Sequence, residues 1–310
     1  MRRKVSRIGP ATLMVSLPSK WVKKYGVKKG DEMELIEKEH QLIFQTNSTM
    51  EVKRLTINFN NSFIWIMKWL MNIIYKLGYD EIEINLKDQN LMADIQKNMN
   101  LNTLYGFEII SYDNNKCVLK EMSAYTQDDF QLFYRRCFNV TIDMLSSCVN
   151  ILKNKNYDEL KNILVLEETN NKLVSACERM INKQNIIQEK KVFYYITVWL
   201  LEKTADIVKD FANYILEQDD SFKINEKTLN ILLQVEKLYS DFFIINFNPS
   251  IEKFKELNKN RKIVSKEIEK LIQETPKNHV KLLFLIRDMN EKLSEFTGSF
   301  IGVNLEKLLI

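Results

Sequence analysis

A long helical region that repeats itself constrains the fold of this chain more than any other feature. From about residue 126 onward, apolar residues recur three or four positions apart, which is the period of a helix with one buried face. Only 7 glycines and 4 prolines occur in 310 residues, as expected for long helices. Breaks in the pattern divide the region into six predicted helices, at 126–153, 157–184, 189–217, 226–246, 250–274 and 277–308.

The third and the sixth of these helices share one pattern, 89 residues apart. The first copy consists of Phe193, Ile196, Thr197, Leu200, Thr204, Ile207 and Phe211. The second copy consists of Leu282, Leu285, Ile286, Met289, Leu293, Phe296 and Phe300. Every apolar position of the first copy falls on an apolar position of the second. We therefore interpret the region as two three-helix units, residues 126–217 and 224–310.

Two smaller domains are expected before the helices. Residues 51–122 read as a small α/β unit, which we interpret as a structural or dimerising connector because nothing in it resembles a catalytic arrangement. Its predicted strands are 53–59, 81–86, 107–112 and 117–121, and its predicted helices are 62–77 and 91–99. The fold class is thus multidomain α+β, with an all-α C-terminal part.

Residues 1–46 alternate like short β-strands on either side of one short helix. The predicted strands are 3–8, 12–17, 32–38 and 41–45, and the helix is 20–25. Ser19 is expected to cap this helix and Gly26 to end it. A segment of this size is too small to enclose a core, so we expect a dimer.

Charge is distributed unevenly between this segment and the rest. Residues 1–30 hold nine Lys or Arg and no Asp or Glu, whereas the remaining chain has 36 basic and 41 acidic residues. A basic N-terminal domain suggests a polyanion such as double-stranded DNA as partner, although a solvated charged face has the same composition. The residues expected to contact DNA are Arg2, Arg3, Lys4, Arg7, Lys20, Lys23 and Lys24.

Acidic pairs recur at the same 89-residue offset. Glu202-x-x-x-Asp206 in the first unit corresponds to Glu291-x-x-x-Glu295 in the second, and residues four apart share one helical face. Like charges at this spacing destabilise a helix, and a bound cation such as Fe, Zn or Mg would remove the penalty. The alternative is two solvated faces neutralised by neighbouring lysines.

The second predicted helix, 157–184, carries three polar residues on its apolar face. They are Glu167, Asn170 and Asn171. They are expected either to support the acidic pairs or to make hydrogen bonds within the core. Cys117, Cys137, Cys148 and Cys177 have no CxxC spacing and are expected to be small buried hydrophobes, and His40 and His279 are expected on the surface. We therefore expect no enzyme, although a metal-dependent hydrolase stays an alternative.

No segment predicts a membrane span. The most apolar run, Phe63–Leu77, is shorter than the roughly 20 residues that a span requires, and Lys68 and Lys76 interrupt it. The N-terminus starts basic and lacks the apolar stretch of a signal peptide. A cytoplasmic protein is expected.

The N-terminal segment resembles the SpoVT/AbrB swapped-hairpin DNA-binding domain. The resemblance rests on RKVSRIG at 3–9 and on VSLPSKWVKKYGVKKGDEMELI at 15–36. It implies an intertwined dimer that binds DNA through basic residues of the first strand and the short helix. Arg3, Lys4 and Lys23 match basic positions of that family, whereas Val22 stands where one branch has Arg.

Residues 126–308 resemble PhoU, whose two three-helix units each carry a Glu/Asp-x-x-x-Asp motif. Leu201-Glu202-Lys203-Thr204-Ala205-Asp206 matches best, and the second copy has Glu295 in place of Asp. The resemblance implies metal binding at these motifs and control of phosphate uptake. The fusion of both domains through a connector looks like the archaeal PhoU-family regulators.

These observations predict a homodimeric transcription regulator that binds promoter DNA with residues 1–46 and receives a signal through its helical domain. The signal is expected from a metal, from phosphate status relayed by a transporter complex, or from another partner protein. The main alternative is an accessory protein that regulates a phosphate transporter by protein contact without binding DNA.

Overall fold

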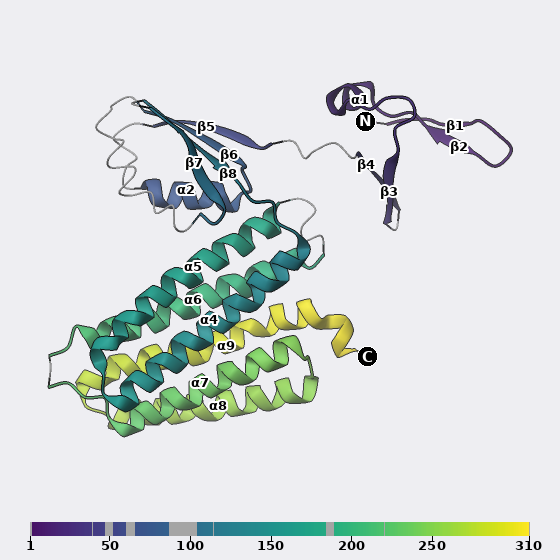
Figure 1. Cartoon of the computed structure of the whole chain (residues 1–310). Helices are drawn as coiled ribbons and strands as arrows, with labels where there is room; N and C mark the ends of the chain where they lie inside the picture. The colour runs from purple at the N-terminus through teal and green to yellow at the C-terminus, as the bar shows by residue number, and fades with distance from the viewer. Residues whose placement is uncertain are drawn as a thin grey trace. The chain divides into compact units, whose positions relative to one another are not determined.

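The computed structural model describes residues 2–38, 40–46, 52–59, 66–86, 104–113, 115–183, 189–219 and 221–309. The chain divides into two compact units, Met1–Val52 and Lys53–Ile310 (Figure 1). We describe each unit by itself. None of the helices in the described ranges combines the length and apolar character that a membrane crossing requires.

The first unit contains two antiparallel hairpins separated by one short helix. β1 (Val5–Arg7) pairs with β2 (Leu13–Val15), and β3 (Met33–Lys38) pairs with β4 (Gln41–Thr46). Between the hairpins lies α1 (Ser19–Tyr25), which confirms the predicted order of elements.

The sequence predicted the C-terminal end of α1 correctly and its N-terminal end incorrectly. Gly26 ends the helix with a φ of 65°, a left-handed conformation that glycine adopts without strain, as predicted. The prediction that Ser19 is the N-cap was wrong, because Pro18 occupies that position and Ser19 is the first helical residue. Proline supplies no side-chain acceptor, so α1 begins without a side-chain cap.

The second unit begins with a four-stranded sheet in the order β5-β6-β8-β7. Its strands are β5 (Arg54–Phe59), β6 (Glu81–Leu86), β7 (Phe107–Tyr112) and β8 (Lys116–Glu121). β5 and β6 are parallel and are connected through α2 (Met67–Lys76), while the other pairs are antiparallel. The predicted helix 91–99 and the first part of the helix predicted at 62–77 lie outside the described residues.

Six long helices follow the sheet, as predicted. They are α4 (Gln127–Asn154), α5 (Lys161–Asn182), α6 (Lys191–Leu216), α7 (Glu226–Phe247), α8 (Ile251–Glu274) and α9 (Lys277–Leu308), with the short 3-10 helix η3 (Tyr157–Leu160) before α5. The side chain of Thr126 accepts a hydrogen bond from the Asp129 amide, and the Asp129 carboxylate accepts one from the Thr126 amide. This capping box fixes the first residue of α4.

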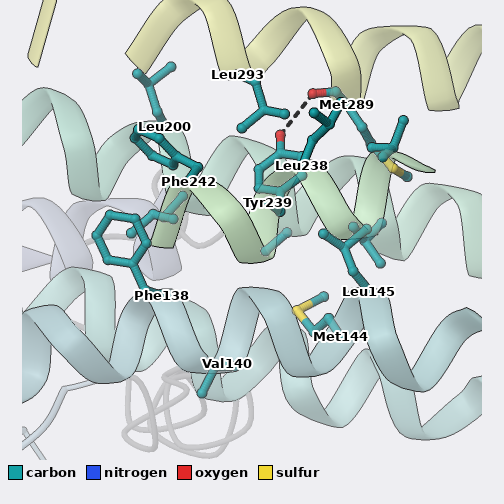
Figure 2. Packing of buried hydrophobic residues seen from close by; sticks show 14 of the residues in the cluster. Phe138, Val140, Met144, Leu145, Leu200, Leu238, Tyr239, Phe242, Met289 and Leu293 are labelled. Atoms are coloured by element: carbon teal, nitrogen blue, oxygen red, sulfur yellow. Dashed lines mark hydrogen bonds between the residues drawn. The ribbon is translucent and has the colours of Figure 1, made fainter. Parts of the chain in front are cut away.

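The two three-helix units share one core. α6 packs along α9, and the buried members of the repeated stripes include Leu200 and Leu293 (Figure 2). The buried Tyr239 hydroxyl donates to the carbonyl of Met289 at 2.8 Å and lies 3.2 Å from the Thr204 hydroxyl, which links α6, α7 and α9. The repeated apolar pattern therefore marks the contact between the two units.

One arginine joins the sheet to the helices within the second unit. Arg179 on α5 is fully buried, and its guanidinium donates to the carbonyl oxygens of Tyr75 and Tyr79 at 2.8 Å each. It also pairs with Glu121 at 2.9 Å and with Asp80 at 3.3 Å. The guanidinium of Arg179 thus binds groups at the end of α2, in the turn before β6 and at the end of β8.

Candidate functional site

The first candidate site is the basic surface of the hairpin unit. Arg7 lies on β1, Arg2, Arg3 and Lys4 precede that strand, and Lys20, Lys23 and Lys24 lie on α1. All seven predicted side chains are exposed. No Asp or Glu precedes Asp31 in the sequence, so β1 and α1 carry positive charge without acidic neighbours along the chain.

The same unit leaves its apolar residues open to water. No described residue of β1 through β4 is buried. The exposed apolar side chains are 36–68% accessible, and they are Val5, Ile8, Leu13, Met14, Val15, Leu35, Leu42, Ile43 and Phe44. Trp21 is half-buried, and its ring centroid lies 5.2 Å from that of Tyr25. Exposed apolar residues gathered in one small unit are typical of an interaction surface.

The second candidate site is the acidic motif of α6. The Asp206 carboxylate accepts hydrogen bonds from Lys203 and from Lys209, each at 3.0 Å. Burial alone would raise the pKa of Asp206, but the hydrogen bonds and charges of the two lysines outweigh it and lower that pKa below 3.8. Lys209 also reaches Glu167 on α5 at 2.6 Å, so one lysine holds two helices together.

Glu202 stands in a different environment on the same face. Its carboxylate lies 3.9 Å from the Lys203 ammonium group, further than the 3.0 Å that separates this group from Asp206. Burial raises the pKa of Glu202 above 4.5, and the nearby carboxylates of Glu178 and Asp206 act in the same direction. The nearly inaccessible Glu178 pairs with Lys76 of α2 at 2.6 Å.

In the second three-helix unit, residues 224–310, the corresponding carboxylates also lie beside basic side chains. Glu291 accepts from Arg261 at 3.0 Å and from the Ser265 hydroxyl at 3.1 Å, both on α8. Glu295 accepts from Lys292 at 2.8 and 2.9 Å. The structure therefore keeps each predicted pair on one helix face, and basic side chains of the chain lie against both pairs.

These donor sets do not resemble a formed metal site. In the part of the chain that the structure describes, no three His, Cys, Asp or Glu side chains gather closely enough to hold a metal ion. A metal at Glu202 and Asp206 would have to displace Lys203 and Lys209. Metal binding at these motifs stays a prediction.

The polar residues of α5 combine the two roles that the sequence left open. Asn170 is fully buried and donates to the Thr141 hydroxyl at 2.9 Å, which is a hydrogen bond within the core. Asn171 instead donates to Glu167 at 2.8 Å, and Glu167 in turn holds Lys209 beside Asp206. Asn171 and Glu167 thus support the acidic pair.

His279 corrects one expectation from the sequence. It was predicted on the surface, but its ring is 7% exposed, stacks on Phe222 at 5.0 Å and hydrogen-bonds the Lys223 carbonyl. The loop before α7 packs against the start of α9. No local sequence pattern predicts such a tertiary contact. The four cysteines are buried and free, as expected.

Comparison with known proteins identifies the first unit. Residues 7–43 match the family described as "Antidote-toxin recognition MazE, bacterial antitoxin". The N-terminal unit is therefore a MazE/AbrB-like domain, which confirms the resemblance seen in the sequence.

A solved structure is similar to part of this chain. It is "Crystal structure of the phosphate transport system regulatory protein PhoU from Streptococcus pneumoniae". The two chains are 13% identical and superpose with a TM-score of 0.47, over 58% of this chain and 94% of the other. None of the curated proteins compared with the sequence matches it.

The contrast between the two acidic motifs gives a test. Replacing Glu202 with Gln should raise the free energy of unfolding by a few tenths of a kcal/mol near neutral pH, because it removes a like charge that burial disfavours. Replacing Glu291 with Gln should lower it, by up to about 1 kcal/mol, because Arg261 loses its partner. Urea denaturation of both variants measures the two effects.

The pH dependence has a defined sign. The raised pKa of Glu202 means that folding favours its protonated form, so the wild-type protein gains stability as the pH falls through that pKa. The advantage of Glu202→Gln should therefore disappear below about pH 4.5. A bound metal would instead be indicated if Glu202→Gln is less stable than the wild type at neutral pH and a chelator lowers the wild type to the same stability.

Proposed function

We propose that this protein is a non-enzymatic transcription regulator, a homodimer that binds promoter DNA through its MazE/AbrB-like unit. The single observation that carries the proposal is the combination of exposed charges and open apolar faces in that unit. Lysine and arginine side chains supply affinity for phosphates, and an arginine that reaches a groove reads base edges. A second copy would cover the apolar residues and double the basic surface.

We further propose that the helical domain receives the signal. The resemblance of residues 201–206 to the PhoU motif favours a signal connected with phosphate uptake, delivered by a transporter complex, a partner protein or a metal. Arg179 and Lys76 connect the helices to the sheet, so a rearrangement of α5 reaches the connector that precedes it in the chain. DNA binding places the site of action in the cytoplasm.

The decisive experiment compares the full chain with a variant lacking residues 1–46, on the protein's own upstream DNA across a salt series. Binding that requires residues 1–46, weakens steeply with salt and outcompetes random DNA is the expected result. Equal binding by both chains would contradict DNA binding through residues 1–46, and no binding by either chain would contradict DNA binding altogether. The transporter-accessory function would then be tested by looking for membrane partners that both chains retain.

A further inference from the structure

The outward face of α6 changes character along its length. Glu202 and Asp206 lie in its middle, and Val192, Tyr195 and Trp199 continue towards its start at spacings of three and four residues. Tyr195 interacts electrostatically with both Glu178 and Glu202, which places it on the same side of the helix. The acidic motif therefore borders a row of large apolar side chains.

These three side chains are open to solvent. Val192 is 67% exposed, Tyr195 37% and Trp199 41%. A single exposed apolar residue needs no explanation, but a continuous row of large apolar side chains beside charged ones is typical of an interaction surface.

The internal repeat shows that the fold does not require this row. At the offset of 89 residues, Val192 corresponds to Lys281 and Trp199 to Asp288 on α9. The third counterpart, Phe284, is 40% exposed and lies 4.7 Å from the guanidinium of Arg287. Two of the three equivalent positions on α9 are thus charged, whereas all three positions on α6 carry large apolar side chains.

The connection to the hairpin unit favours a second copy of the chain as the occupant. β4 ends at Thr46 and β5 begins at Arg54. A chain advances at most about 3.5 Å per residue, so this stretch reaches no further than about 28 Å. Two chains joined through their hairpin units therefore hold their second units at a high effective concentration. A small complementary face is then sufficient for the two second units to pair.

The face is also complementary to itself. If two α6 helices cross antiparallel at Trp199, the two indole rings meet and each Tyr195 lies opposite a Lys203 of the other chain. An ammonium group over an aromatic ring is a favourable contact, and the acidic residues stay at the edge of the pairing.

We propose that the face formed by Val192, Tyr195 and Trp199 pairs with the same face of a second copy, and so joins the two helical domains within the dimer. This inference rests on the proposed dimerisation of the hairpin unit. It places the acidic motif of each chain next to the contact, where a change in the charge of Glu202 or Asp206 would alter the pairing.

Cysteine cross-linking in the full-length chain tests the pairing. All four native cysteines are buried, so a new surface cysteine is the only accessible thiol in the described residues. Trp199→Cys lies where the two helices are proposed to cross, and the matched control is Val165→Cys on α5, where Val165 is 63% exposed. The molar mass of both variants in solution is first measured by light scattering. Both are then treated with a mild copper oxidant and analysed on a non-reducing gel.

The proposal expects the mass of a dimer and at least about tenfold more cross-linked product for Trp199→Cys than for Val165→Cys. A dimer mass with equal or no cross-linking of Trp199→Cys would overturn the α6 pairing and leave the hairpin dimer in place. A monomer mass for both variants would instead overturn the hairpin dimer, and with it the proposed function and this inference together.

Discussion

Replacing Arg179 with methionine should lower the free energy of unfolding by about 3–5 kcal/mol. The arginine is fully buried, and its removal leaves Asp80 and Glu121 with fewer partners. It also takes the arginine donor from the Tyr79 carbonyl, while the Tyr75 carbonyl keeps the Gly78 amide. Unpaired buried charges and carbonyls retain the full cost of their desolvation. Urea or guanidinium denaturation of the full chain measures the loss.

The matched control for this substitution is Lys183→Met. Lys183 contacts the same two carboxylates, at 2.7 Å from Asp80 and 2.6 Å from Glu121, but lies nearer the surface. Its loss should cost only about 1 kcal/mol, because water replaces it. Arg179→Lys should behave like the methionine variant, since one ammonium group cannot reach both carbonyls and both acids. Equal stability of the Arg179 and Lys183 variants would contradict a buried junction.

The pH dependence of the junction follows from Asp80. Burial alone would raise the pKa of Asp80, but the hydrogen bonds from Lys183 and from the Lys53 amide outweigh it and lower that pKa below 3.8. A carboxylate with a lowered pKa stabilises the fold above its unfolded pKa and loses that contribution as the pH falls through the lower, folded value. The connector is therefore expected to loosen only in strong acid.

Removing two basic residues, one on β1 and one directly before it, should weaken DNA binding by a factor on the order of 100 at about 0.15 M salt. The variant is Lys4→Ala together with Arg7→Ala, which removes four charges from a dimer. Each lost phosphate contact lowers the slope of the logarithmic salt dependence by about 0.9, so the full set should lower it by about 3–4. Fluorescence anisotropy across a salt series measures both quantities.

A charge-matched control distinguishes direct contacts with DNA phosphates from the general electrostatic attraction between the basic unit and DNA. Lys28 and Lys29 lie in the turn after α1, and replacing both with Ala removes the same number of charges from an equally exposed part of the unit. Their loss should change the slope by less than about 1. If both double variants weaken binding equally, the first strand does not contact DNA, and the basic residues act only through the net charge of the unit.

Local patterns in the sequence determined most of the elements. Apolar period and turn glycines are properties of neighbouring residues, which is why the six helices and the end of α1 at Gly26 were predicted correctly. The N-terminal domain was recognised because its strand, helix and turn residues occupy one short stretch. Ser19 was placed wrongly because Pro18 takes the N-cap position that a hydroxyl side chain would otherwise fill.

The sequence alone determined the repeat, the basic N-terminal unit and the acidic pairs, because each is written in the spacing of residues along the chain. Only the tertiary structure decided which partners those residues meet. Lys209 joins Glu167 to Asp206, Arg179 reaches a sheet about 100 residues away, and His279 is covered by Phe222. Such contacts depend on how helices cross and pack, and residues far apart in sequence carry no local signal of that geometry.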